Sequence, residues 1–165
     1  MDQSLPIIYS RSGPAAVSGS RLGPGRRLLA LGVGVGCLAV LVLAALLPPN
    51  PAGVGSHRAL GLNSCQFLDS TGLPCPSCGM TTSFTWFARG NLLASVYVQP
   101  MGAALASIAA GCVWGGFYVA ATGRPVYRLL RLMPGRYYLL PLLALGVLAW
   151  GWKILIHLNG RDGWR

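Results

Sequence analysis

The chain has 165 residues, of which 53% are hydrophobic and only 10% charged, and 13 Lys and Arg against 3 Asp and Glu leave a net charge of +10. A soluble domain carries about 25% charged residues, so this composition argues against a water-soluble core and favours an integral membrane protein. The basic residues flank long apolar runs, where they signal topology and contact anionic lipid headgroups, so we expect no nucleic acid partner.

The first part of the chain predicts a polar arm followed by a membrane span. Residues 1–25 are rich in Ser, Gly, Pro and Arg and lack an apolar period, which predicts a disordered basic arm. Residues 28–47 are apolar and uncharged, long enough to cross a hydrocarbon core of roughly 30 Å. No clear signal-peptidase site follows this run, so we expect an uncleaved anchor that opens a membrane domain over residues 26–158.

The region between the first two spans predicts an irregular loop and two short helices. Residues 48–70 carry Pro and Gly and predict a loop. Met80, Phe84 and Phe87 then fall on one face of a short helix. Gly90 is suited to end it, and Asn91 to cap a second helix over residues 92–98. Both helices are too short to cross a bilayer, so we expect them to be interfacial or re-entrant.

The second span is predicted over residues 101–121 and carries a stripe of small residues. Ala103, Ser107, Gly111 and Gly115 recur every four positions, which places them on one face. Such a face permits close approach of another helix. We expect that helix to come from the same chain, with a partner membrane protein as the alternative.

A basic amphipathic connector over residues 122–138 precedes the third span, predicted over residues 139–158, and a short tail covers residues 159–165. Trp150, Trp152 and Lys153 near the end of this span are typical of an interfacial belt with a snorkelling lysine. His157 lies one turn beyond Lys153, so a proton-handling pair is the alternative interpretation.

Arginine counts predict the orientation. The residues before the first span (1–27) and the connector each carry four arginines, whereas the long loop between the first two spans carries only Arg58 and Arg89. Because cytoplasmic segments are enriched in Lys and Arg, we expect the N-terminus in the cytoplasm and the cysteine loop outside it.

The segment from Thr71 to Thr81 is the one stretch that indicates chemistry. It contains Cys75 and Cys78 at CxxC spacing, and Pro76 between them is suited to the first position of a helix. Cys75 would then be the N-cap, and the positive end of the helix dipole would stabilise a thiolate. Of the five cysteines, Cys37 and Cys112 lie in apolar runs and are expected to be inert.

Three interpretations of the remaining cysteines stay open. In the first, Cys75 is the attacking thiolate and Cys78 is the cysteine that resolves the mixed disulfide. Cys65 can then accept the disulfide. In the second, Cys65, Cys75, Cys78 and His57 bind a metal, since three sulfurs and one nitrogen form a valid zinc set. In the third, a disulfide from Cys65 to Cys75 or Cys78 clamps the loop. No further cofactor is indicated, and a hydrolytic site is not expected because the chain has no Glu and only three Asp.

These residues resemble a bacterial family of small membrane proteins, the domain-of-unknown-function family 2752. Its members are similar in an upstream Cys followed by Thr-Gly-x-x-Cys-Pro-x-Cys-Gly-x-Thr-Arg. Cys65 takes the upstream place here, and the matching core residues are Thr71, Gly72, Cys75, Pro76, Cys78, Gly79 and Thr81. Thr82 stands where the family usually has a basic residue, and Gln99 replaces an Asn before Pro100. The resemblance covers residues 65–125 and implies a membrane protein with a cysteine signature, but no activity.

The sequence as a whole predicts an all-α integral membrane protein with three transmembrane helices and one or two short interfacial or re-entrant helices. The function that it favours is that of a multi-pass membrane protein whose extracytoplasmic cluster of Cys65, Cys75 and Cys78 carries out thiol redox chemistry or binds a metal. The alternative is a non-enzymatic structural or scaffold component in which the cysteines form a clamp.

Overall fold

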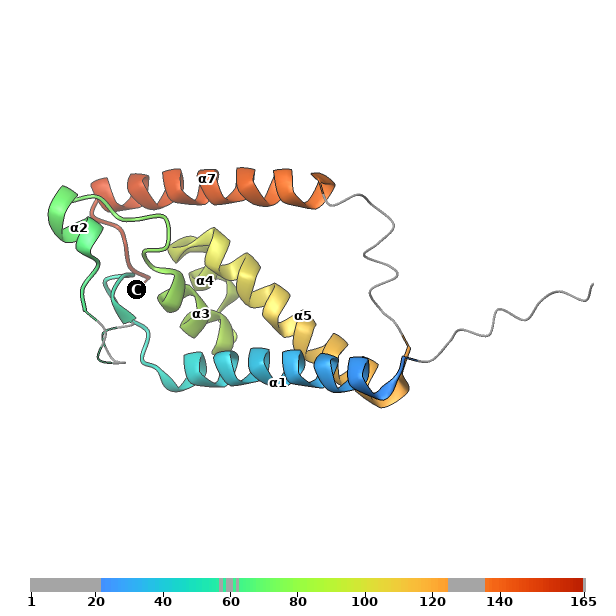
Figure 1. Ribbon diagram of the computed structural model, residues 1–165. Coiled ribbons are helices and arrows are strands. Elements are labelled where there is room, and N and C mark those ends of the chain that lie inside the picture. The colour runs from blue at the N-terminus through green and yellow to red at the C-terminus, as the bar shows by residue number, and fades with distance from the viewer. Residues whose placement is uncertain (1–21, 57, 59–60, 62, 125–135, 165) are drawn as a thin grey trace, which may run out of the picture.

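The computed structural model describes residues 22–56, 58, 61, 63–124 and 136–164. Most of the predicted basic arm, most of the predicted connector and His57 lie outside these residues. Every regular element in the described part is a helix, and it contains no strand (Figure 1). The all-α prediction is confirmed.

Three long helices carry the predicted spans. They are α1 (Pro24–Leu46), α5 (Pro100–Thr122) and α7 (Arg136–Leu158). Pro24–Leu46, Pro100–Thr122 and the stretch Leu139–Leu158 of α7 are each long and apolar enough to cross a membrane. Many of their large apolar side chains are exposed, Trp114 to 80% and Leu148 to 71%. Such surfaces suit contact with lipid, and the prediction of a multi-pass membrane protein is confirmed.

Helices α1 and α5 cross where two glycines meet. A Cβ on Gly116 would lie 2.9 Å from the Cα of Gly34 and 2.6 Å from the carbonyl oxygen of Ala30. Near the crossing, the Arg27 guanidinium donates to the carbonyl oxygen of Ala120 at 2.6 and 2.9 Å. The two helices therefore approach to backbone contact at one end of the bundle.

The predicted stripe of small residues on α5 is not the face that packs against α1. Ala103 is buried, but a Cβ on Gly111 or Gly115 would meet nothing within 4 Å, and Ser107 is exposed. The expectation that this face packs within the chain is therefore wrong beyond Ala103. A partner helix on this face stays a prediction.

Among the described residues between α1 and α5 lie three short helices, and not one or two. They are α2 (Gln66–Thr71), α3 (Met80–Ala88) and α4 (Leu92–Val98). The predicted α3–α4 boundary is confirmed, because Gly90 has φ +80° and the Asn91 side chain accepts a hydrogen bond from the Ala94 N–H at 3.0 Å. Helix α2 lies in the stretch that was expected to be an irregular loop.

Two serines join α3 and α4. The Ser83 hydroxyl donates to the carbonyl oxygen of Ser95 at 2.9 Å, and the Ser95 hydroxyl donates to the carbonyl oxygen of Ser83 at 2.8 Å. A Cβ on Gly102 of α5 would lie 2.8 Å from the Ser83 Cβ. The α3–α4 hairpin is thus packed on the first turn of α5, where it supports the residues that precede α3.

The segment after α7 folds back onto the loop that follows α1. A Cβ on Gly163 would lie 1.5 Å from the carbonyl oxygen of Pro51, which only glycine allows. The Tyr97 ring makes edge contacts with Trp152 and Trp164, with centroids 5.9 and 5.6 Å apart. The short helices, the loop after α1 and the final residues therefore gather at one end of the bundle (Figure 1).

Candidate functional site

The CxxC segment is a turn that precedes α3 and is not its first turn. The Cys78 N–H donates to the carbonyl oxygen of Cys75 at 2.9 Å, and α3 begins only at Met80. Gly79, with φ +86°, is the N-cap of α3, so Pro76 is not the first helical residue and Cys75 is not the cap. The prediction of a helix dipole acting directly on Cys75 is therefore wrong.

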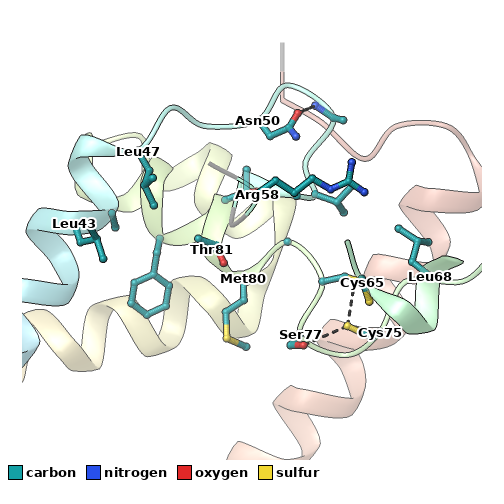
Figure 2. A pocket seen from close by; sticks show the side chains of 18 of the residues that line it. Leu43, Leu47, Asn50, Arg58, Cys65, Leu68, Cys75, Ser77, Met80 and Thr81 are labelled. Carbon is teal, nitrogen blue, oxygen red and sulfur yellow. Dashed lines mark hydrogen bonds between the residues drawn. The ribbon is translucent and has the colours of Figure 1, made fainter. Parts of the chain in front are cut away.

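The structure brings all three predicted site cysteines together. Their sulfurs lie within 4.8 Å of one another, and the Cys75 and Cys78 sulfurs are 3.1 Å apart. Cys65 reaches this group from the N-cap of α2, while Cys75 and Cys78 come from the turn. Figure 2 shows Cys65, Cys75 and Ser77 grouped on one side of a cavity. All five cysteines of the chain are free thiols in the structure.

The two cysteines of the turn have opposite electrostatic environments. Burial raises the pKa of Cys75, but hydrogen bonds with the side chains of Ser77, Cys78 and Cys65 outweigh it and lower the pKa to about 7. Burial, followed by hydrogen bonds to Cys75 and Cys65, raises the pKa of Cys78 to about 12. Near neutral pH, Cys75 is thus partly a thiolate and Cys78 a protonated thiol.

One face of α7 holds the turn in place through its backbone. The Trp150 indole N–H donates to the carbonyl oxygen of Pro74 at 3.0 Å, and the Nε2 atom of His157 lies 3.2 Å from the carbonyl oxygen of Gly72. From α5, the N-cap residue Gln99 donates its side-chain N–H to the carbonyl oxygen of Pro76 at 2.8 Å. The carbonyls on both sides of Cys75 are therefore fixed by distant elements.

Lys153 lies on this same face and is fully buried, contrary to the prediction of a snorkelling lysine. Its ammonium forms an ion pair with Asp162 at 3.2 Å and donates to the carbonyl oxygen of Gly53 at 3.3 Å. Asp162 also contacts the Nδ1 atom of His157 at 2.5 Å. A Cβ on Gly79 would lie 3.3 Å from the Lys153 Nζ, so this buried charge stands directly behind the cysteine turn.

The sequence contained a signal for this face that our interpretation missed. Trp150, Lys153 and His157 have the spacing i, i+3 and i+7, which places three polar groups on one side of an otherwise apolar helix. An interfacial belt explains their position along α7, but a polar stripe of this spacing indicates a buried partner.

Thr82 and Gln99 both make structural hydrogen bonds in this chain. Thr82 is fully buried, and its hydroxyl pairs with the Ser56 hydroxyl at 2.8 Å. Ser56 in turn accepts from the Asn50 N–H at 3.0 Å, so Thr82 links α3 to the loop after α1. Gln99 has the hydrogen bond to Pro76 described above.

A cavity of about 650 Å³ opens beside the cysteines. Its walls come from the last turns of α1, the loop after α1, the cysteine turn and α3. In Figure 2, Leu43 of α1 and Leu47, its C-cap, lie on one side, Cys65 and Cys75 on the other, and Met80 and Thr81 between them. The lining is largely apolar, and Arg58 is its one charged side chain among the described residues.

Fold and site together define a multi-pass helical membrane protein with a three-cysteine site at one end. A family model described as "Protein of unknown function (DUF2752)" matches residues 65–113. The matched segment runs from Cys65 through α3 and α4 into α5, which supports the resemblance to that family. No curated protein and no solved structure matches the chain.

Proposed function

We propose that this protein is a membrane thiol–disulfide redox protein in which Cys75 and Cys78 are the reactive pair. The observation that carries the proposal is their asymmetry, because Cys75 has a pKa of about 7 while its neighbour, 3.1 Å away, has a pKa of about 12. An attacking cysteine reacts best when its pKa is near the ambient pH. A resolving cysteine is best kept protonated until the mixed disulfide has formed.

The reaction balances as a thiol–disulfide exchange. The Cys75 thiolate attacks one sulfur of a substrate disulfide and expels the other sulfur as a thiolate. Cys78 loses its proton and attacks the Cys75 Sγ, which releases the second substrate thiol and leaves a Cys75–Cys78 disulfide. Counted from the dithiol, with the Cys75 proton lost to solution beforehand, the chain loses two electrons and two protons, and the substrate disulfide gains two electrons and takes up two protons. Cys65 is close enough to accept the disulfide from Cys75 in a further exchange.

A metal site is the second candidate function, and the mutual approach of the three sulfurs favours it. Thiolates around zinc, with Zn–S of about 2.3 Å, lie about 3.8 Å from one another, and the three sulfurs here lie within 4.8 Å. His57 is the fourth ligand in this proposal and lies outside the described residues. A clamp made by a Cys65 disulfide is the non-enzymatic alternative.

We place the N-terminus in the cytoplasm and the cysteine site outside it. The arginine distribution supports this orientation. Disulfide chemistry also persists more readily outside the cytoplasm.

Differential thiol labelling in intact cells tests the proposal. A membrane-impermeant maleimide is applied before and after mild reduction, with single Cys→Ser variants to assign the labelled sites. We expect Cys75 to label after reduction and the Cys78→Ser variant to accumulate a mixed disulfide through Cys75. The Cys37→Ser variant serves as a control, because this cysteine lies within α1.

Each other result selects a different interpretation. Stable oxidation with no trapped mixed disulfide supports the clamp. Labelling that appears only after a chelator supports the metal site, which equilibrium dialysis with zinc would then quantify. Labelling that requires a permeant maleimide reverses the proposed orientation.

A further inference from the structure

The cavity beside the cysteines joins a membrane helix to a reactive sulfur. Val40 and Leu43 of α1 form one wall with Leu47, the C-cap of that helix, and Cys75 and Cys78 stand on another. Leu43 and Val40 are 48% and 52% exposed, so this wall also faces the surroundings of the span. A ligand that entered beside α1 would therefore meet an apolar wall of the same cavity that Cys75 and Cys78 line.

The two ends of the cavity differ in chemistry. Hydrocarbon side chains on α1, with Phe84 of α3, suit an apolar tail. At the other end lies the Arg58 guanidinium, whose side chain makes no hydrogen bond or ion pair with any other described residue. A cation there can stabilise negative charge that develops on a ligand oxygen. The volume, about 650 Å³, is within the range of small-molecule sites, about 300–1,000 Å³.

We propose that the cavity binds the ring of a lipid-soluble quinone, which oxidises the Cys75–Cys78 dithiol. This inference rests on the redox function proposed above and names the oxidant of that site. Because thiol–disulfide exchange is reversible, a substrate dithiol would reduce the Cys75–Cys78 disulfide, and the quinone would form that disulfide again. An oxidant for this cavity must accept two electrons, enter beside α1 and carry an oxygen that Arg58 can stabilise when it is reduced. A lipid-soluble quinone has all three properties, whereas a lipid acyl chain has only the second.

The step balances in atoms and electrons. The Cys75 thiolate adds to a ring carbon and forms a C–S bond, which moves negative charge onto a ring oxygen facing Arg58. Cys78 loses its proton and attacks the Cys75 Sγ, so the S–S bond forms while the C–S bond breaks. The ring leaves with the electron pair and takes up two protons, one from Cys78 and one from solution, as a quinol. One dithiol becomes one disulfide for each quinone reduced.

The experiment uses the full chain, purified, reduced and placed in lipid nanodiscs. It is mixed with a quinone that bears a ten-carbon tail, with the same quinone without the tail, and with glutathione disulfide. Quinol absorbance and mass spectrometry of the Cys75–Cys78 disulfide follow the reaction. We expect one quinol per chain and a rate constant about tenfold higher for the tailed quinone, equivalent to about 1.4 kcal/mol.

Two neighbouring positions on α1 provide a matched pair of variants. Leu43 lines the cavity and is 48% exposed, whereas Val42 does not line it and is 49% exposed. We expect Leu43→Trp to lower the ratio of the tailed-quinone rate to the glutathione-disulfide rate about tenfold, and Val42→Trp to leave it unchanged. Arg58→Gln should lower the quinone rate because the developing oxyanion loses its cation.

Failure of this inference differs from failure of the redox function. If glutathione disulfide oxidises the pair but the tailed quinone does not, the quinone proposal is overturned and the redox function stands. Equal effects of Leu43→Trp and Val42→Trp, or equal rates with both quinones, also overturn it. If neither oxidant produces the Cys75–Cys78 disulfide, the redox function itself is wrong.

Discussion

The indole N–H of Trp150 donates a hydrogen bond at 3.0 Å to the carbonyl oxygen of Pro74, which lies 76 positions earlier in the chain. Pro74 is fully buried and directly precedes Cys75. Because proline has no N–H, its carbonyl oxygen is the only backbone group through which this residue can be held by hydrogen bonding. The contact therefore fixes the backbone next to Cys75 from the third span.

The Trp150→Phe variant removes this hydrogen bond and keeps an aromatic ring. We expect it to lower the free energy of unfolding by about 1 kcal/mol, the net contribution of one hydrogen bond. Because the backbone before Cys75 is then less constrained, we also expect the alkylation rate of Cys75 to change. SDS-titrated unfolding in mixed micelles and iodoacetamide kinetics measure the two effects.

Trp152→Phe is the matched control for this prediction. Its indole N–H donates to the carbonyl oxygen of Tyr97 at 2.7 Å, away from the cysteine turn. We expect a similar loss of stability and an unchanged alkylation rate at Cys75. Equal alkylation kinetics in the two variants would mean that Trp150 only stabilises the fold.

The reactivity of Cys75 should depend on pH around neutrality. Alkylation requires the thiolate, whose fraction increases as the pH rises through the Cys75 pKa of about 7. We expect the rate at pH 6 to be about one tenth of the plateau reached near pH 9. Cys78, with a pKa of about 12, should stay unreactive over this range. A midpoint near the ordinary value for cysteine would contradict the geometry of the site.

Ser77 provides a direct test of what lowers this pKa. Its hydroxyl lies 3.2 Å from the Cys75 Sγ, and removal of that hydrogen bond in Ser77→Ala should move the midpoint of the alkylation profile upward. Ser70→Ala is a suitable control, because the Ser70 hydroxyl donates to the carbonyl oxygen of Phe67 within α2. Identical profiles in the two variants would mean that Ser77 has no role.

Lys153 should be essential for stability because its charge is buried and paired. Lys153→Met leaves the Asp162 carboxylate, only 16% exposed, without its cation, and loss of one partner of a buried pair costs about 3–5 kcal/mol. The double variant Lys153→Met/Asp162→Asn leaves no unpaired charge and should recover part of this loss. Unfolding in mixed micelles measures both. A lysine that only snorkelled to the interface would give a Lys153→Met variant with near-native stability.

The crossing of α1 and α5 can be tested with two adjacent glycines. Gly116→Val places a branched side chain against the backbone of α1, and such overpacking costs about 1–3 kcal/mol or more. Gly115→Val points into open space and should be tolerated. Protein level in the membrane and thermal unfolding distinguish the two. A destabilised Gly115→Val variant would instead indicate that a partner helix covers the predicted small-residue face.

The features predicted correctly depend on local sequence. Apolar length defined the three spans, and the Gly90–Asn91 pair defined the boundary between two short helices through backbone and capping preferences that act within a few residues. The approach of Cys65 to the CxxC pair was also predicted, since only ten positions separate Cys65 from Cys75. Helix α2 was missed because six residues are too few to display a helical period.

The features that were missed depend on contacts between distant segments. Proline suits the first position of a helix, but Pro76 lies in a turn. Hydrogen bonds from Gln99, at the start of α5, and from Trp150 of α7 hold the carbonyl groups of this turn. From its position near the end of the third span, Lys153 resembles an interfacial lysine. Its contacts with Asp162 and with the carbonyl oxygen of Gly53 become visible only in the structure. The face of α5 that packs against α1 was predicted wrongly. The crossing angle of the two helices brings Gly116 against Gly34, and the spacing of small residues along α5 does not reveal that angle.

The distance in sequence between Pro74 and Trp150 also affects biogenesis. The cysteine turn leaves the ribosome 76 residues ahead of the indole that anchors it, and Lys153 and Asp162 follow later still. At about 5–20 residues per second, translation of that interval takes roughly 4–15 s. During this interval the nascent thiols lack the neighbours that set their reactivity. Premature oxidation would then trap the loop before α7 docks, so timely insertion of the last span determines whether the thiols reach their native surroundings reduced.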